Sequence, residues 1–137
     1  LEFRRVLFRS TVLVNPEIEP VGDEQWTNWE GCLSMPAMRG RVPRWKRIRL
    51  TAVDLDGRRT TRLVAGKQAR TVQHEYDHLD GRLYPSRMVE THTLGYLEEL
   101  VRSGQVPAYT PNRSAEYLKG QDALLARLKR VGRTWVL

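Results

Sequence analysis

The chain has 137 residues, of which 40% are hydrophobic and 28% charged, and these proportions are ordinary for one globular domain. No stretch approaches the roughly 20 consecutive apolar residues that a membrane-spanning helix needs, so we expect a cytoplasmic protein without membrane partners. The 23 Lys and Arg outnumber the 16 Asp and Glu and give a net charge of +7, which we interpret as a basic surface rather than a DNA-binding site.

The N-terminal third of the chain predicts short extended segments. Residues 1–10 show neither strand alternation nor a helical stripe and read like a translated cloning or assembly adaptor, so we expect the natural sequence to start at about Thr11. Residues 11–16 predict a strand that ends at Asn15-Pro16, and the polar residues 17–29 predict a loop or irregular hairpin. Gly and Pro punctuate residues 30–36, which predicts extended backbone.

A β-hairpin is predicted next. Apolar residues alternate from Ile48 to Ala52 and then change phase, which indicates a bulge. Asp56-Gly57 is a strong signal for a hairpin turn, and residues 60–64 supply the returning strand.

A helix over about residues 67–80 follows, because apolar residues recur there at intervals of three and four, at Ala69, Val72, Tyr76 and Leu79. Gly81 marks its end. We further expect a brief strand at 82–84, a helix from Thr93 to Ser103, and a linker with a basic C-terminal helix within 105–137. The predicted class is α+β: small antiparallel sheets packed around a central helix, with C-terminal helices, in a single domain over residues 11–137.

The helix at 67–80 carries the pattern H-E-x-x-H, from His74 to His78. Residues four apart project from one face of a helix, so both imidazoles can reach one metal ion. Glu75 lies beside His74, where its carboxylate can contact a water molecule on that ion. The pattern therefore predicts a metal-dependent hydrolase site with Glu75 as general base.

A catalytic site of this type needs a third protein ligand, and the residues leave two candidates. A third histidine six residues after His78 is absent, because that position holds Tyr84. Glu98, twenty residues after His78, fits the pattern of a zinc endopeptidase. The other candidate is Cys32, the chain's single cysteine, which excludes an internal disulfide.

The surroundings of Cys32 favour the second candidate. Glu30-Gly31-Cys32-Leu33-Ser34, followed by Gln73-His74-Glu75-x-x-His78, resembles the second and third signature motifs of the peptide deformylases. The resemblance runs from about Thr11 to Met88 and includes Asn15-Pro16-Glu17 and the stretch from Met35 to Arg44.

This resemblance implies a specific site, in which the metal ligands are Cys32, His74 and His78 and the catalytic residue is Glu75. It also implies that the backbone N–H of Leu33 stabilises the developing oxyanion. The backbone around Gly31 and Leu33 would bind the peptide as an added strand, and Arg39 would lie near the substrate path. We expect the sulfur of Cys32 within about 6 Å of the ring nitrogens, close to metal–thiolate geometry.

The implied reaction is removal of the N-formyl group from the N-terminal methionine of newly made polypeptides. A divalent ion lowers the pKa of its bound water towards about 7, and the resulting hydroxide attacks the formyl carbon. Glu75 takes the water proton and delivers it to the leaving amine. The resemblance favours Fe(II) as the ion, and Zn or Ni would also suit these donors. The expected partner is an N-formylmethionyl peptide.

Two features depart from the family pattern or lie beyond it. The family's first motif, Gly-x-Gly-x-Ala-Ala-x-Gln, is absent from residues 1–29, so we expect an N-terminally truncated deformylase with little or no activity. Lys67 and Arg70 are positioned on the helix where they could approach the methionine pocket.

Residues 113–133, in the expected C-terminal helix, hold six Lys or Arg against two Asp or Glu. Their basic character leaves two interpretations, a ribosome-docking helix or a helix packed on its own domain. A non-catalytic remnant whose metal site only stabilises the fold is a third reading of the whole chain, beside the deformylase and the endopeptidase.

Overall fold

The computed structural model describes residues 11–107, and residues 13–107 form one compact unit. The expected adaptor-derived segment and the basic C-terminal helix fall outside the described residues. The elements in chain order are β1 (Val14–Pro20), β2 (Gln25–Cys32), β3 (Met35–Trp45), β4 (Arg47–Val53), β5 (Arg59–Ala65), α2 (Gly66–Leu79), η1 (Tyr84–Arg87), η2 (Thr91–Thr93), β6 (Gly95–Tyr96) and α3 (Leu97–Arg102).

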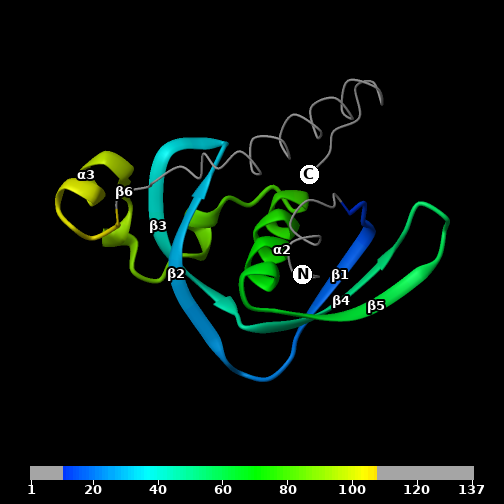
Figure 1. Cartoon of the computed structure of the whole chain (residues 1–137). Coiled ribbons are helices and arrows are strands. Elements are labelled where there is room, and N and C mark those ends of the chain that lie inside the picture. The colour runs from blue at the N-terminus through cyan, green and yellow to red at the C-terminus, as the bar shows by residue number, and fades with distance from the viewer. Residues whose placement is uncertain (1–10, 108–137) are drawn as a thin grey trace, which may run out of the picture. The chain divides into compact units, whose positions relative to one another are not determined.

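The strands form two small antiparallel sheets with orders β1-β4-β5 and β2-β3-β6. Helix α2 follows β5 directly and lies centrally in the unit, between the two sheets (Figure 1). This arrangement confirms the predicted α+β class and the central helix with the H-E-x-x-H pattern. No helix in residues 11–107 combines the length and the apolar character needed to cross a lipid bilayer.

The hairpin of β4 and β5 forms where it was predicted. The Asp54 carboxylate accepts hydrogen bonds from the backbone N–H groups of Asp56 and Arg58, each at 2.9 Å, and Gly57 turns the chain at a φ of 78°. The bulge predicted after Ala52 is wrong, because β4 and β5 pair without a shift. The irregularity lies in β1 instead, where Asn15 has a φ of 47°.

The predicted end of the first strand at Asn15-Pro16 is also wrong, and so is the loop or irregular hairpin over 17–29, because most of these residues lie in β1 and β2, which belong to different sheets. β1 continues through Pro16, which is tolerated because, within residues 11–107, β1 is an edge strand that pairs with β4 alone. Glu17 and Glu19 are exposed and pair with Arg59 of β5 and Arg49 of β4, at 3.0 and 3.1 Å. An exposed edge strand of this kind has no apolar alternation by which a sequence could reveal it.

The core joins the β1-β4-β5 sheet to α2. Ile48 and Leu50 of β4, at 0% and 1% exposure, pack with Val64 of β5 and Ala69 of α2. The alternation predicted in β4 therefore identifies its buried face. The helical stripe does so only in part, because Leu79 is 60% exposed.

The rest of the buried face of α2 is polar and consists of Arg70, Gln73 and Asp77. The helix ends as predicted at Gly81, whose φ of 69° allows the N–H of Arg82 to bond the carbonyl of Asp77 at 2.9 Å.

Beyond α2 the predictions hold less well. The strand predicted at 82–84 is absent from this part of the structure, where a 3₁₀ turn begins at Tyr84. The predicted helix from Thr93 to Ser103 shortens to α3, because Gly95 and Tyr96 pair with β3 as the short strand β6. Gly104, with a φ of 74°, follows the end of α3 as expected.

Candidate metal centre

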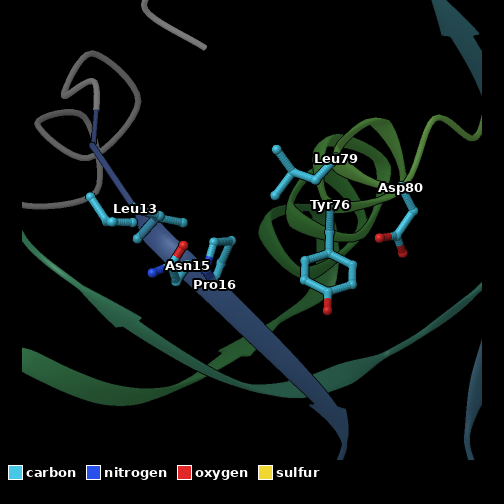
Figure 2. A pocket seen from close by; sticks show the side chains of 7 residues that line it. Leu13, Asn15, Pro16, Tyr76, Leu79 and Asp80 are labelled. Atoms are coloured by element: carbon cyan, nitrogen blue, oxygen red, sulfur yellow. The ribbon is translucent and has the colours of Figure 1, made fainter.

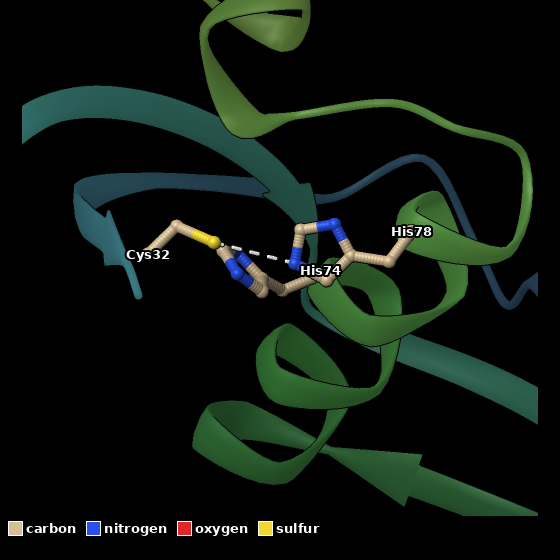
Figure 3. Close-up of side chains that lie close together, drawn as sticks. All are labelled: Cys32, His74 and His78. Atoms are coloured by element: carbon tan, nitrogen blue, oxygen red, sulfur yellow. Dashed lines mark hydrogen bonds between the residues drawn. The ribbon is translucent and has the colours of Figure 1, made fainter. Parts of the chain in front are cut away.

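Three potential metal ligands converge from two elements. Cys32 is the last residue of β2, and His74 and His78 project from α2 on successive turns (Figure 3). The Cys32 Sγ lies 3.4 Å from the His78 Nε2, and the ligand atoms of all three residues lie within 4.8 Å of one another. Two such ligands on one tetrahedral ion are about 3.5 Å apart. The predicted sulfur and nitrogen cluster is confirmed.

The hydrogen bonds of the two imidazoles fit a metal site. The His74 Nδ1 lies 3.0 Å from the Glu30 Oε2, and the His78 Nδ1 lies 3.1 Å from the carbonyl oxygen of Arg82. A carbonyl oxygen only accepts, so the His78 Nδ1 donates this hydrogen bond, and the Nε2 is the ring nitrogen that faces the sulfur of Cys32. Such outer contacts fix the ring orientation of metal-binding histidines. These donors suit a divalent transition metal ion.

The charges of the site favour the ligand form of the cysteine. Burial raises the pKa of the Cys32 thiol, but hydrogen bonds from Ser34 and the two imidazoles outweigh burial and bring the pKa to about 7. Burial lowers the pKa of His74, but the hydrogen bonds and the charges of Glu30 and Cys32 together outweigh burial and raise it. The neighbours of Cys32 thus stabilise a thiolate, the form in which cysteine binds metals.

A buried charge network lies behind the ligands, and the sequence reasoning missed it. Arg44 of β3 donates to Glu30 of β2 through Nε and Nη2, at 2.9 and 3.0 Å, and to Asp77 of α2 through Nη1 at 2.6 Å. Burial raises the pKa of both carboxyl groups, yet the arginines hold both below their usual values. Charged residues are normally exposed, so residue type alone gave no signal. The available clue was that Glu30 and Asp77 lie within two residues of a metal ligand in the chain.

The buried side chains of Gln73 and Arg70 join α2 to backbone groups of the neighbouring strands. The Gln73 side chain accepts from the N–H of Trp45 at 3.0 Å and donates to its carbonyl at 2.9 Å, which attaches α2 to the end of β3. Arg70 donates to the carbonyls of Trp26, Asn28 and Val42. The suggested approach of Arg70 to a methionine pocket is therefore wrong, since its guanidinium is engaged in the core. Lys67 is exposed.

The remaining predicted residues surround the ligand cluster. Glu75 is half-buried on α2, and its carboxylate has no hydrogen bond or ion pair with residues 11–107. Leu33, 100% exposed, lies in the tight turn between β2 and β3. The Arg39 guanidinium packs against the α-carbon of Gly31, on the strand that ends in Cys32.

Two other features lie apart from this cluster. Glu98, the alternative third ligand, is exposed in the first turn of α3 and does not belong to the ligand cluster. An open, largely apolar hollow separates β1 from the end of α2, where Leu13, Asn15 and Pro16 face Tyr76 and Leu79 (Figure 2). None of the predicted site residues lines that hollow.

Known proteins that resemble this chain are peptide deformylases, in agreement with the ligand cluster. A family model described as polypeptide deformylase matches residues 2–93. Peptide deformylase 1 of Bordetella pertussis is 52% identical over 90 residues, which cover 66% of this chain and 51% of that protein. Peptide deformylase 2 of Ralstonia nicotianae is 50% identical over 90 residues, with the same coverage of each chain. The chain spans about half the length of the curated relatives it matches.

Solved structures agree. A class I type b peptide deformylase from Acinetobacter baumannii with Met-Ala-Ser bound has a TM-score of 0.55 at 41% identity, covering 57% of this chain and 49% of that one. A peptide deformylase from Synechococcus elongatus in complex with actinonin has a TM-score of 0.57 at 32% identity, covering 72% and 52%. The family model covers most of the chain, and Cys32, His74 and His78 form the metal-ligand cluster, so the chain belongs to the polypeptide deformylase family.

Proposed function

We propose that this chain carries the catalytic metal site of a peptide deformylase and removes the formyl group from N-formylmethionyl peptides. The observation that carries the proposal is the clustering of Cys32, His74 and His78 within 4.8 Å in a member of this family. The relative from Acinetobacter baumannii binds Met-Ala-Ser, a peptide of the kind that deformylation would release. A nascent chain as substrate places the proposed activity in the cytoplasm.

Cys32, His74 and His78 would hold one divalent ion, which would polarise the formyl carbonyl and activate a water molecule. The thiolate and imidazole donors suit Fe(II), Zn and Ni, and family membership leads us to propose Fe(II) as the native ion.

Glu75 is the proposed general base and then general acid. Its carboxylate lies one residue after His74 and is not engaged by any residue in the described range, so it can accept a proton from water. The same proton can then pass to the departing amine, which leaves a free N-terminus and formate.

The hairpin of β2 and β3 is the proposed peptide-binding edge. Among the residues that the structure describes, β2 lies at the edge of its sheet and pairs with β3 alone, so the backbone of Gly31 can bond an added peptide strand. The N–H of Leu33, next to the ligand Cys32, would donate to the developing oxyanion. Arg39, beside Gly31, would contact the bound peptide.

The test combines metal content with formate release. The 137-residue protein, loaded with Fe(II) without oxygen, should hold one ion per chain and release formate from formyl-Met-Ala-Ser faster than its metal-free form. Because the 137 residues lack the Gly-x-Gly-x-Ala-Ala-x-Gln motif, the rate should be about 10²–10³ times lower than that of a deformylase with this oxyanion donor. A metal-loaded protein no faster than the metal-free form would favour a non-catalytic remnant.

A pair of variants separates the deformylase from the zinc endopeptidase. Cys32→Ala should abolish metal binding and Glu98→Ala should preserve it, because Cys32 belongs to the ligand cluster and Glu98 is exposed outside it. The reverse result would support the endopeptidase. Ribosome docking by the basic residues 113–133 stays a prediction, since these residues lie outside the described range.

A further inference from the structure

Arg44 forms ion pairs with carboxylates from two different elements at once. Its guanidinium forms a two-pronged pair with Glu30 of β2 and a third hydrogen bond with Asp77 of α2. All three side chains are buried, with exposures of 5%, 6% and 4%. A planar guanidinium presents these donors in fixed directions, whereas a lysine ammonium on its flexible stem does not.

The two carboxylates flank the metal ligands in the chain. Glu30 lies two residues before Cys32 and also binds the Nδ1 of His74, and Asp77 immediately precedes His78. One guanidinium therefore connects the strand that supplies the sulfur ligand with the helix turn that supplies the nitrogen ligands.

Asp77 is held from a second side. Arg87, in the 3₁₀ turn after α2, donates to it through Nη2 at 2.6 Å and through Nε at 3.1 Å. Because both oxygens of Asp77 are bonded to arginines, this carboxylate has a fixed orientation. Arg44 therefore joins Glu30 to a carboxylate that is itself held in place. Arg87 is 39% exposed and touches the network only at Asp77, so its influence on the ligands is less direct.

We propose that Arg44 is a positioning residue that sets the separation between Cys32 and the two histidines before the metal binds. The inference depends on the metal site of the proposed function but not on deformylation. Without the three contacts of Arg44, α2 is still joined to β2 through Arg70 and His74, but less rigidly. Part of the binding free energy is then spent on bringing the ligands together. Outer contacts of this kind are worth about 10- to 100-fold in metal affinity.

The test compares Arg44→Lys with Arg41→Lys in the full chain. Arg41 lies on the same strand and also pairs with a glutamate, Glu90, at 3.0 Å, but this pair is exposed and contacts no ligand. Titration of the metal-free protein with Co²⁺ gives the affinity, and the visible absorption of bound Co²⁺ reports the ligand geometry. Arg44→Lys should bind Co²⁺ at least about tenfold more weakly with an altered spectrum, and Arg41→Lys should match the wild type.

The outcomes separate positioning from stability. If Arg44→Lys lowers the melting temperature of the metal-free protein but keeps the wild-type affinity and spectrum, Arg44 is only a structural residue and the inference fails. Should Arg44→Lys not fold, Arg87→Lys replaces it, with a smaller loss of affinity expected and an unchanged affinity overturning the inference. A wild-type protein that binds no Co²⁺ would refute the metal site, and this inference with it.

Discussion

The position of Glu75 follows from the local geometry of α2. This residue follows His74 on the same helix, so any backbone that keeps α2 helical keeps its carboxylate beside the ligands. Arg70, Gln73 and Asp77 lie on the buried side of the same helix and are engaged with strands. The proposed proton transfer and the structural support would thus be divided between two faces of one helix.

Replacement of Glu75 by glutamine should separate metal binding from chemistry. Glu75→Gln removes the proton acceptor but keeps the size of the side chain and all three ligands. We expect formate release to fall about 10²-fold or more, with one metal ion per chain retained. Formate release and elemental analysis on the same preparation check both points. A variant with the wild-type rate would show that another group accepts the proton.

At the scale of single residues, the sequence predicted the metal ligands but not the buried charged residues behind them. The H-E-x-x-H spacing and the motif around Cys32 identify the three ligands, because these atoms must meet at one ion. Glu30, Arg44 and Asp77 escape such reasoning, since a buried ion pair depends on partners from three elements. Chain order gives no sign that β3 brings Arg44 between the other two.

At the scale of elements, predictions succeeded where one face of an element is apolar. β4 and its hairpin partner β5 show the alternation or turn signals that a half-buried sheet requires, and α2 shows the helical period. Among the described residues, β1 and β2 lie at sheet edges and carry largely polar residues, so β1 was predicted to end too early and most of β2 was predicted as a loop or irregular hairpin. Pairing in three dimensions, which local sequence does not encode, decides those two elements.

The β2–β3 hairpin has an unequal pairing next to the ligand cysteine. Between the pairs Cys32–Met35 and Glu30–Gly40, β2 contributes one residue, Gly31, and β3 contributes four, residues 36–39. The bulge includes Ala37 at a φ of 61° and returns Arg39 towards β2, where its guanidinium packs on Gly31.

A methyl group at Gly31 should therefore disturb the proposed peptide site without unfolding the protein. In Gly31→Ala the new Cβ displaces the flexible end of Arg39, so we expect KM to rise about tenfold, equivalent to about 1.4 kcal/mol of lost binding. Gly57→Ala is the matched control, because its φ of 78° makes alanine cost about 1–2 kcal/mol of stability at a distant turn. Its KM should stay unchanged while its melting temperature falls. Equal KM values for the two variants would contradict a substrate role for this edge.

At the scale of the whole unit, the metal site joins two elements that lie far apart in the chain. Cys32 and His78 are separated by 46 residues, and this stretch contains β3, β4 and β5. An ion bound to both would restrain β2 against α2 in the folded state only, because the unfolded chain does not hold the three ligands together.

Metal removal should thus lower the stability of the unit. At an ion concentration 1,000 times the dissociation constant, binding adds about 4 kcal/mol to the free energy of unfolding. Thermal unfolding should show a lower melting temperature after chelation and full recovery when the ion is restored. Cys32→Ala should melt at the same temperature with and without chelator. A wild-type melting temperature unaffected by chelation would mean that the ion does not bridge the two elements.

The unequal support of the two histidines has a consequence for engineering. His78 is held by the main-chain carbonyl of residue 82, so almost any amino acid at that position preserves the contact. His74 relies on the carboxylate of Glu30, which only a similar side chain could replace. A saturation library should consequently tolerate broad diversity at position 82 and almost none at position 30, although neither residue is itself a ligand.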